Sequence, residues 1–239
     1  MQSHCRGEMS DVESASGIVL RRGWLSRTPK SFQRAVLDHC RLRTFKKGEA
    51  LYRAGDPPGG MFGLISGGVA IEIAPSERGP YIGGFATPGT WYGEVSAITS
   101  QPRRVGLVAT RKSQLLHLSL TAIHQIVAED PAAWRLIALV TVLQLDAVVT
   151  AYDDLMRRDH DKRLVAILLH LCGCRHSTPA DFAPIDVDIG QDDLAGMSNI
   201  ARTSAGTILR ELEKAGHLER SYRCITVRSP DELRAMLTG

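Results

Sequence analysis

Glycine and proline are distributed unevenly along this chain of 239 residues, and their distribution constrains the fold more than any other feature. Between residues 43 and 118, short apolar runs are interrupted by turns rich in Gly, Pro and Asp, as in residues 55–60. Val69, Ile71 and Ile73 alternate with their neighbours, with the period of two that indicates a half-buried strand. Many short strands separated by glycine turns predict a β-barrel or β-roll.

A different pattern begins at Pro131, after which neither residue type occurs up to Leu171. Apolar residues recur there at three- and four-residue steps over more than three heptads, which predicts one long helix. The members of this apolar band are Trp134, Ile137, Leu139, Val142, Leu145, Val148, Val149, Tyr152, Leu155 and Met156. Either this helix packs on the β-roll of its own chain, or it pairs with the same helix of a second copy. We favour a homodimer, because symmetric pairs are the commonest oligomers.

The composition is that of an ordinary soluble globular protein, with 44% hydrophobic residues, 23% charged residues and a net charge of +3. Net charge therefore does not indicate nucleic acid. The best candidate for a membrane span, residues 136–145, is too short, and residues 1–17 lack the apolar core of a secretory signal. Five scattered cysteines argue against a disulfide framework. We expect a cytoplasmic protein with free thiols and no membrane partner.

Residues 191–212 have the pattern of a helix-turn-helix. In that motif the first helix needs a small residue where the second approaches, and the turn needs a residue that tolerates left-handed dihedral angles. Ala195 is the small residue, and Asn199 lies at the turn, where Asn is an acceptable substitute for Gly. The apolar positions expected to face inward are Leu194, Ile200, Ala205, Ile208 and Leu212.

The segment that follows predicts a wing. Gly216 is placed to cap the second helix, and residues 218–227 are typical of a two-stranded hairpin. Any three-helix cluster can show the helix-turn-helix spacing, but the attached wing favours a DNA-binding domain. From residue 191 onward, seven Lys and Arg accompany seven Asp and Glu. Contact with DNA must therefore come from the arrangement of the charges and not from their excess.

The outward residues of the second helix are the candidates for reading bases. Arg202 suits a bidentate contact with guanine O6 and N7, and Thr203 and Thr207 suit phosphate or the methyl group of thymine. The arginines of the wing suit phosphate, which positions a protein without specifying sequence. The predicted DNA-binding residues are Arg202, Thr203, Ser204, Thr207, Arg210, Arg220 and Arg223.

Taken in order, these motifs resemble the Crp/Fnr family of bacterial transcription regulators. Residues 45–51, 55–57 and 65–71 have the order and spacing of the cyclic-nucleotide-binding β-roll of that family, and the long helix and winged helix-turn-helix follow. The resemblance covers residues 24–237. It implies a non-enzymatic homodimer that binds a near-palindromic operator in double-stranded DNA and acts with RNA polymerase.

The resemblance also implies an α+β fold with four parts. They are a loose N-terminal tail at 1–22, a cyclic-nucleotide-binding-like β-roll at 23–128, a long dimerisation helix at 129–160, and a winged helix-turn-helix DNA-binding domain at 161–239. The charged run at 157–163 is interpreted as a solvated hinge between the last two parts.

The phosphate cassette of the family resembles Gly93-Glu94-Val95-Ser96, followed by Arg104. By this resemblance, Arg104 pairs with a cyclic phosphate, and Glu94 accepts a hydrogen bond from the ribose. A hydroxyl residue normally follows the arginine, but Val105 stands here. The hydroxyl positions that the family presents from its long helix fall on Val148 and Val149, one step before Thr150.

The predicted ligand-binding residues are Gly93, Glu94, Val95, Arg104, Val105, Val149 and Thr150. Two interpretations of this site stay open. The effector is cyclic AMP or another cyclic nucleotide, or the Glu94–Arg104 pair is a structural remnant in a pocket that binds something else or nothing.

Particular residues bear on three other possibilities, an iron-sulfur sensor, a metal site and an enzyme. Iron-sulfur sensors of this family use closely spaced N-terminal cysteines, whereas only Cys5 stands there. The local cluster of His170, Cys172, Cys174 and His176 lacks the usual spacing of structural zinc sites, and we predict no metal. No nucleophile-base pair or P-loop indicates an enzyme. The alternative function is a cyclic-nucleotide sensor that acts through protein contacts without sequence-specific DNA binding.

Overall fold

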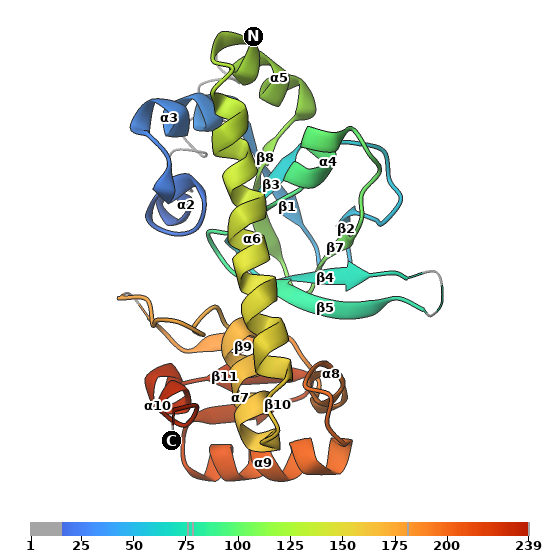
Figure 1. Cartoon of the computed structure of the whole chain (residues 1–239), viewed down its shortest axis with the longest axis vertical. Coiled ribbons are helices and arrows are strands. Elements are labelled where there is room, and N and C mark those ends of the chain that lie inside the picture. Colours follow the sequence, from blue (N-terminus) through green and yellow to red (C-terminus); the bar gives the residue numbers. More distant parts are fainter. Residues whose placement is uncertain (1–15, 76, 78, 181, 239) are drawn as a thin grey trace. The chain divides into compact units, whose positions relative to one another are not determined.

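The computed structural model describes residues 16–75, 77, 79–180 and 182–238. The chain divides into two compact units, Met1–Gln144 and Leu145–Gly239, and each is described here by itself (Figure 1).

The first unit contains two four-stranded sheets whose strands pair antiparallel, with the orders β1-β8-β3-β6 and β2-β7-β4-β5. The strands are β1 (Cys40–Phe45), β2 (Ala50–Tyr52), β3 (Met61–Ser66), β4 (Val69–Ile73), β5 (Tyr81–Ala86), β6 (Trp91–Tyr92), β7 (Gly106–Ala109) and β8 (Ser113–Leu118). Alternate residues of both sheets, such as Phe62, Leu64, Leu115 and Leu107, share one buried core. The predicted β-roll is confirmed.

Helices in the first unit build a second core beside the β1-β8-β3-β6 sheet. They are α2 (Gly17–Arg21), the 3-10 helix η1 (Leu25–Arg27), α3 (Lys30–Asp38), α4 (Glu94–Thr99), α5 (Leu120–Glu129) and the start of α6 (Ala133–Leu155). Trp24 lies at the centre of this core, with its ring edge-on to Phe32 and Trp91 at centroid distances of 5.7 and 5.3 Å. Its indole nitrogen donates to the Leu136 carbonyl, which attaches α6 to this unit.

The expectation of a loose tail up to residue 22 is wrong for Gly17–Arg21, which form α2. Val19 is fully buried, with Ile18 and Leu20 packed against the same core. The consecutive apolar residues Ile18, Val19 and Leu20 give this short helix a surface to bury. The polar residues before it make the whole segment resemble a tail in the sequence. The first 15 residues of the expected tail lie outside the described residues.

Helix α6 is shorter than the predicted range 129–160. It ends at Leu155, and a new helix, α7 (His160–Leu171), begins after Asp159. The Asp159 carboxylate accepts hydrogen bonds from the backbone amides of Asp161 and Lys162 at 2.9 and 3.1 Å. This N-cap stabilises a separate helix start and explains why one continuous helix does not form.

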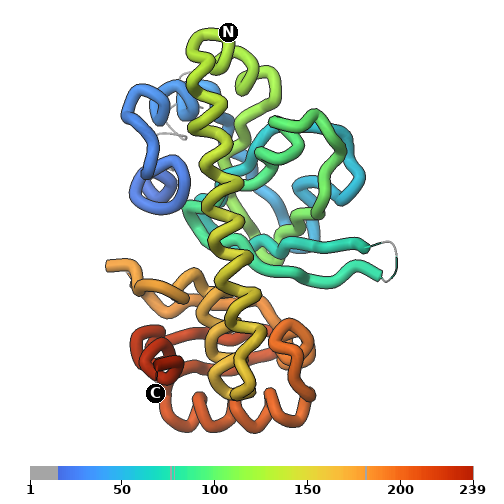
Figure 2. The backbone as a smooth tube through the Cα atoms, viewed as in Figure 1, coloured from blue at the N-terminus to red at the C-terminus, as the bar shows by residue number. Residues whose placement is uncertain are grey.

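The second unit contains α7, β9 (Ile185–Val187), α8 (Gln191–Met197), α9 (Arg202–Lys214), β10 (Leu218–Ser221), β11 (Cys224–Val227) and α10 (Pro230–Ala235). Helix α7 is its central helix, with every side chain from Leu164 to Leu169 buried. Figure 2 follows the backbone from α7 through α8 and α9 to the hairpin and α10. The hairpin strands and β9 form one antiparallel sheet in the order β10-β11-β9.

Candidate functional site

Helices α8 and α9 form the predicted helix-turn-helix. Leu194, Ala205 and Ile208 are buried as expected, with Ala195 and Leu212, and Ile200 is half-buried. Asn199 has a φ of +50°, which is the left-handed conformation predicted for the turn.

The start of α9 is held closely against the start of α8. The Gln191 amide donates to the Arg202 carbonyl at 3.1 Å. A Cβ atom on Gly206 would lie 2.6 Å from the same amide nitrogen, so a larger residue there would displace the Gln191 side chain and disturb this hydrogen bond. The bond connects the starts of the two helices at the backbone of Arg202.

One side of α9 presents an exposed polar row of Arg202, Thr203, Thr207 and Arg210, and Ser204 is half-buried beside it. Arg210 donates to the Thr207 hydroxyl at 2.9 Å, and that hydroxyl donates to the Thr203 carbonyl at 3.2 Å. Arginine and hydroxyl groups on one exposed helix face are the groups that hydrogen-bond to base edges and phosphates.

The wing is present, and its two predicted arginines differ in surroundings. Arg220 is part-buried and donates twice to the Glu213 carboxylate, from Nε at 2.8 Å and from an NH2 group at 2.6 Å. These hydrogen bonds hold the pKa of Glu213 below its usual value and attach the wing to α9. Arg223 lies at the exposed tip with a φ of +54°, beside Tyr222, which is 93% exposed.

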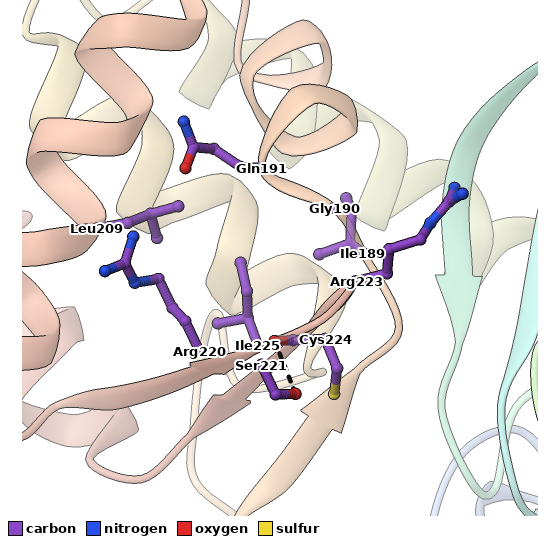
Figure 3. A pocket seen from close by; sticks show the side chains of 9 residues that line it. All are labelled: Ile189, Gly190, Gln191, Leu209, Arg220, Ser221, Arg223, Cys224 and Ile225. Atoms are coloured by element: carbon purple, nitrogen blue, oxygen red, sulfur yellow. Dashed lines mark hydrogen bonds between the residues drawn. The ribbon is translucent and has the colours of Figure 1, made fainter.

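A shallow hollow of about 150 Å³ lies between the wing, α9 and the start of α8. Figure 3 shows the Arg220 side chain pointing toward Leu209 on α9, whereas the side chain of Arg223 extends away from the hollow. Of the two, Arg223 is the one more accessible to a partner outside the unit, and Arg220 serves the attachment of the wing.

In the first unit, the cassette residues surround a buried arginine. Gly93 has a φ of +107° at the start of α4, and a Cβ there would lie 2.6 Å from both an Arg103 nitrogen and the Gly60 carbonyl. Arg103 is 6% exposed, donates to the Gly93 and Gly60 carbonyls at 3.0 and 2.7 Å, and lies over the Tyr52 ring at 4.2 Å. Gly93 and Arg103 thus form one close-packed polar site.

Glu94 connects this site to the long helix. Its carboxylate is 1% exposed and accepts from the Thr141 hydroxyl of α6 at 3.2 Å. Burial raises the pKa of Glu94, although hydrogen bonds from the backbone and from Thr141 oppose the shift. Gln144 on the same helix donates to the Trp91 carbonyl at 2.9 Å. One polar side chain of α6 therefore bonds to the cassette residue Glu94, and a second bonds to Trp91 just before the cassette.

The predicted cassette arginine and its neighbour lie in different surroundings. Arg104 is exposed, and the adjacent Arg103 is the residue that lies against Gly93. Val105 and Val95 are half-buried. The two arginines are consecutive in the sequence, and no local signal distinguishes them.

The helix positions predicted to line the ligand site belong to the second unit. Val149 is exposed, and the Thr150 hydroxyl donates to the Asp146 carbonyl one turn earlier at 2.8 Å. The α6 hydroxyl that meets the cassette is that of Thr141, which the sequence reading did not select.

The segment 157–163 is solvated over most of its length, since residues 158–161 are exposed and Arg157 and Lys162 are half-buried, but it ends in a buried residue. Arg163 is 9% exposed and donates to the carbonyls of Arg157 and Asn199 at 2.8 and 3.1 Å. Arg157 donates to the Asp154 carboxylate at 2.8 Å. Backbone carbonyls therefore hold the last charge of the run inside the second unit, a contact that composition alone does not reveal.

The His and Cys cluster near the end of α7 is engaged in contacts within the unit. His170 contacts Asp154 at 3.0 Å, and the buried Cys174 thiol donates to the Cys172 carbonyl at 3.6 Å. Among the residues that the structure describes, no group of three His, Cys, Asp or Glu side chains is arranged to hold a metal ion.

Comparison with known proteins agrees with both units. Residues 42–130 match the family model described as cyclic nucleotide-binding domain, and residues 162–236 match the Crp-like helix-turn-helix domain. The chain belongs to the Crp/Fnr family. It is therefore a transcription regulator, and not an enzyme, with an effector domain like those that bind cyclic nucleotides and a helix-turn-helix domain that binds DNA.

Solved structures share this fold at low sequence identity. A Ruegeria pomeroyi protein, provisionally described as a cyclic nucleotide binding protein, has 20% identity and a TM-score of 0.68, over 95% of this chain and 98% of that one. The c-di-GMP responsive global regulator CLP of Xanthomonas campestris has 21% identity and a TM-score of 0.58, over 83% and 99%.

A curated relative from Rhodopseudomonas palustris, provisionally described as a potassium channel protein, is 26% identical over 100 residues. The match covers 42% of this chain and 24% of that protein. This chain therefore spans about a quarter of the length of that relative.

Proposed function

We propose that two copies of this Crp/Fnr chain bind a near-palindromic operator, acting in the cytoplasm with RNA polymerase, under the control of an anionic effector in the first unit. The observation that carries the DNA-binding part is the exposed row on α9, which begins at Arg202, whose backbone carbonyl accepts from the Gln191 amide. Arg202 is the base-reading residue, and Thr203 and Thr207 contact phosphate or thymine methyl groups.

The exposed apolar residues of α6 support the dimer. Val142, Leu145, Val149, Tyr152 and Met156 follow one another at steps of three, four, three and four, and each is between 51% and 66% exposed. This is the a/d spacing of a coiled coil. Large apolar side chains in such a row are covered by a partner, and an identical helix has the matching row.

By its length and mean hydropathy, α6 would also suit a membrane. The segment considered from the sequence, residues 136–145, is too short to show this. Two features favour the coiled coil. The exposed apolar residues form one row and do not surround the helix, and Asp146 and Asp153 lie exposed between them. A lipid-facing helix would place those carboxylates in hydrocarbon.

Gly93, Glu94 and Arg103 fit an anionic ligand. The guanidinium of Arg103 has five N–H donors, and backbone carbonyls take two of its nitrogens. Gly93 lets Arg103 and the Gly60 carbonyl lie close to the start of α4, because a Cβ at residue 93 would clash with both. Cyclic mononucleotides and cyclic di-GMP, which the descriptions of the two structural relatives name, both carry phosphodiesters. An effector that accepts hydrogen bonds from Arg103 or donates one to Glu94 would change the contact between Glu94 and Thr141, and so the position of α6.

Calorimetric titration with cyclic AMP, cyclic GMP and cyclic di-GMP tests the effector site, paired with DNA binding in the presence of each. We expect Arg103→Ala to abolish the heat of binding and the matched variant Arg104→Ala to retain it. Equal loss in both variants would contradict the assignment of Arg103. Absence of heat for the wild-type chain with all three nucleotides would reject a cyclic-nucleotide effector and leave DNA binding standing.

Selection of bound sequences from a random duplex library tests DNA recognition. The wild-type chain is expected to enrich one near-palindromic motif, and Arg202→Ala to lower affinity for that motif by about ten-fold or more, the value of one bidentate base contact. Lys214→Ala, at the other end of α9, is the matched control and should keep the motif. Enrichment of no motif by the wild-type chain would reject sequence-specific binding and favour a sensor that acts through protein contacts.

A further inference from the structure

Two consecutive carboxylates lie at the start of α8, each paired with an arginine from one of the two DNA-facing elements. Asp192 Oδ1 is 2.7 Å from Nε of Arg202, the first residue of α9. Asp193 Oδ2 is 3.7 Å from an NH2 nitrogen of Arg223, at the tip of the wing. One turn of α8 therefore contacts the arginines of both elements.

These ion pairs are exposed and exchangeable. The side chains of Arg202 and Asp192 are 73% and 63% exposed, and exposed ion pairs of this kind are weak and screened by salt. A guanidinium in such a pair can leave its carboxylate for a better partner. While it stays, its attraction for a passing phosphate is reduced by the neighbouring negative charge.

The pairing discriminates between the two kinds of DNA contact. Non-specific binding depends on attraction between cations and phosphates. At the operator, a base edge offers Arg202 two directed hydrogen-bond acceptors, which compensate for the lost contact with Asp192. At an arbitrary site Arg202 meets only a phosphate, and that phosphate is repelled by Asp192 and Asp193.

We propose that Asp192 and Asp193 are specificity-determining residues, which occupy Arg202 and Arg223 off the operator and suppress binding to non-operator DNA. This inference rests on the proposed function, because it takes the α9 and wing surface as the surface that meets DNA. The carboxylates lower affinity for all duplexes, and they lower it most for those that offer only phosphates.

The test compares Asp192→Asn and Asp193→Asn with the wild-type full-length chain. Affinities are measured for the selected operator duplex and for a scrambled duplex between 50 and 300 mM salt. The control is Glu232→Gln, which removes the same charge from α10 of the same unit, where Glu232 pairs with His217. Thermal unfolding of each variant verifies that folding is retained.

We expect each Asp variant to bind the scrambled duplex about three- to ten-fold more tightly than the wild type, with a smaller gain on the operator, so that the ratio of the two affinities falls. The slope of log K against log salt on scrambled DNA should steepen by about one as the freed arginine gains a phosphate. Affinities and slopes equal to those of Glu232→Gln, or equal gains on both duplexes, would overturn the proposal.

The outcome is separable from failure of the proposed function. If the wild-type chain shows no preference for any sequence, the proposed operator recognition fails. The scrambled-duplex affinities and salt slopes then still decide whether these carboxylates restrain Arg202 and Arg223, and unchanged values reject the inference.

Discussion

Asp154 is fully buried and accepts four hydrogen bonds, from Arg157, from His170 and twice from Arg175. Burial alone would raise its pKa, but the hydrogen bonds from Arg175 and Arg157 outweigh burial and lower the pKa to about 2 from an ordinary 3.8. The residue lies near the end of α6, whereas His170 belongs to α7 and Arg175 follows it. This carboxylate therefore holds the end of the long helix against the rest of the second unit.

The Asp154→Asn variant is expected to unfold more easily at pH 7 by about 3 kcal/mol, because it leaves half-buried arginines without their carboxylate. The depressed pKa means that ionised Asp154 stabilises the folded state by roughly 2 kcal/mol. That stabilisation is complete above about pH 4 and is lost as the pH falls toward 2. Urea unfolding from pH 7 to pH 3 measures it, with Asp153→Asn, an exposed neighbour, as control. A difference between the two variants that stays constant over this range would contradict the assignment.

Asn199 provides a second prediction for a single residue. Its left-handed conformation costs glycine nothing and costs a β-branched residue about 1–2 kcal/mol. Asn199→Gly should therefore keep the wild-type free energy of unfolding, and Asn199→Val should lower it by that amount in a urea titration. Equal values for the two variants would mean that the turn adopts another conformation.

Residue-level prediction from the sequence succeeded where one residue type meets a local demand, as Asn199 does at its turn. It does not distinguish Arg104 from Arg103, which lies against Gly93, because the two arginines are consecutive in the sequence. Thr141 and Asp154 were also missed. Their partners, Glu94 and Arg175, lie far away in the sequence, and no spacing rule connects such pairs.

At the scale of elements, α6 carries the most consequential prediction. Val149→Asp places a charge in the middle of the exposed apolar row and is expected to dissociate the dimer, lowering affinity for the full operator at least ten-fold. Ala147→Asp introduces the same charge on the helix between the a/d positions and should leave the dimer intact. Sedimentation equilibrium measures both. A monomeric wild-type chain, or a Val149→Asp variant that stays dimeric, would contradict the coiled coil.

A helix or strand can be predicted from the sequence when the residues that determine it lie close together in the chain. The spacing from Leu194 to Leu212 and the cap at Gly216 define the helix-turn-helix within about 25 residues, and the structure confirms it. Helix α2 and the end of α6 were misjudged, because packing of Val19 and capping by Asp159 decide them.

For the whole molecule, the division of the chain falls within α6, between Gln144 and Leu145, and not at the end of the helix. On one side of this division, Thr141 and Gln144 form hydrogen bonds with Glu94 and Trp91 of the first unit. On the other side, Asp154 accepts from Arg175 of the second unit. The helix is thus attached at both ends to different units. In the function proposed above, this continuity is the route by which an effector in the first unit would reposition α9.

The central claim is that a symmetric pair of these chains reads two half-sites with its α9 helices. Hydroxyl-radical footprinting on the selected operator, and on a version with five base pairs inserted between the half-sites, tests it most directly. The account predicts two protected half-sites centred about one helical turn apart, and loss of at least ten-fold in affinity on insertion, because half a turn places the second half-site on the opposite face of the duplex. A single protected half-site, or equal affinity for both duplexes, would contradict it.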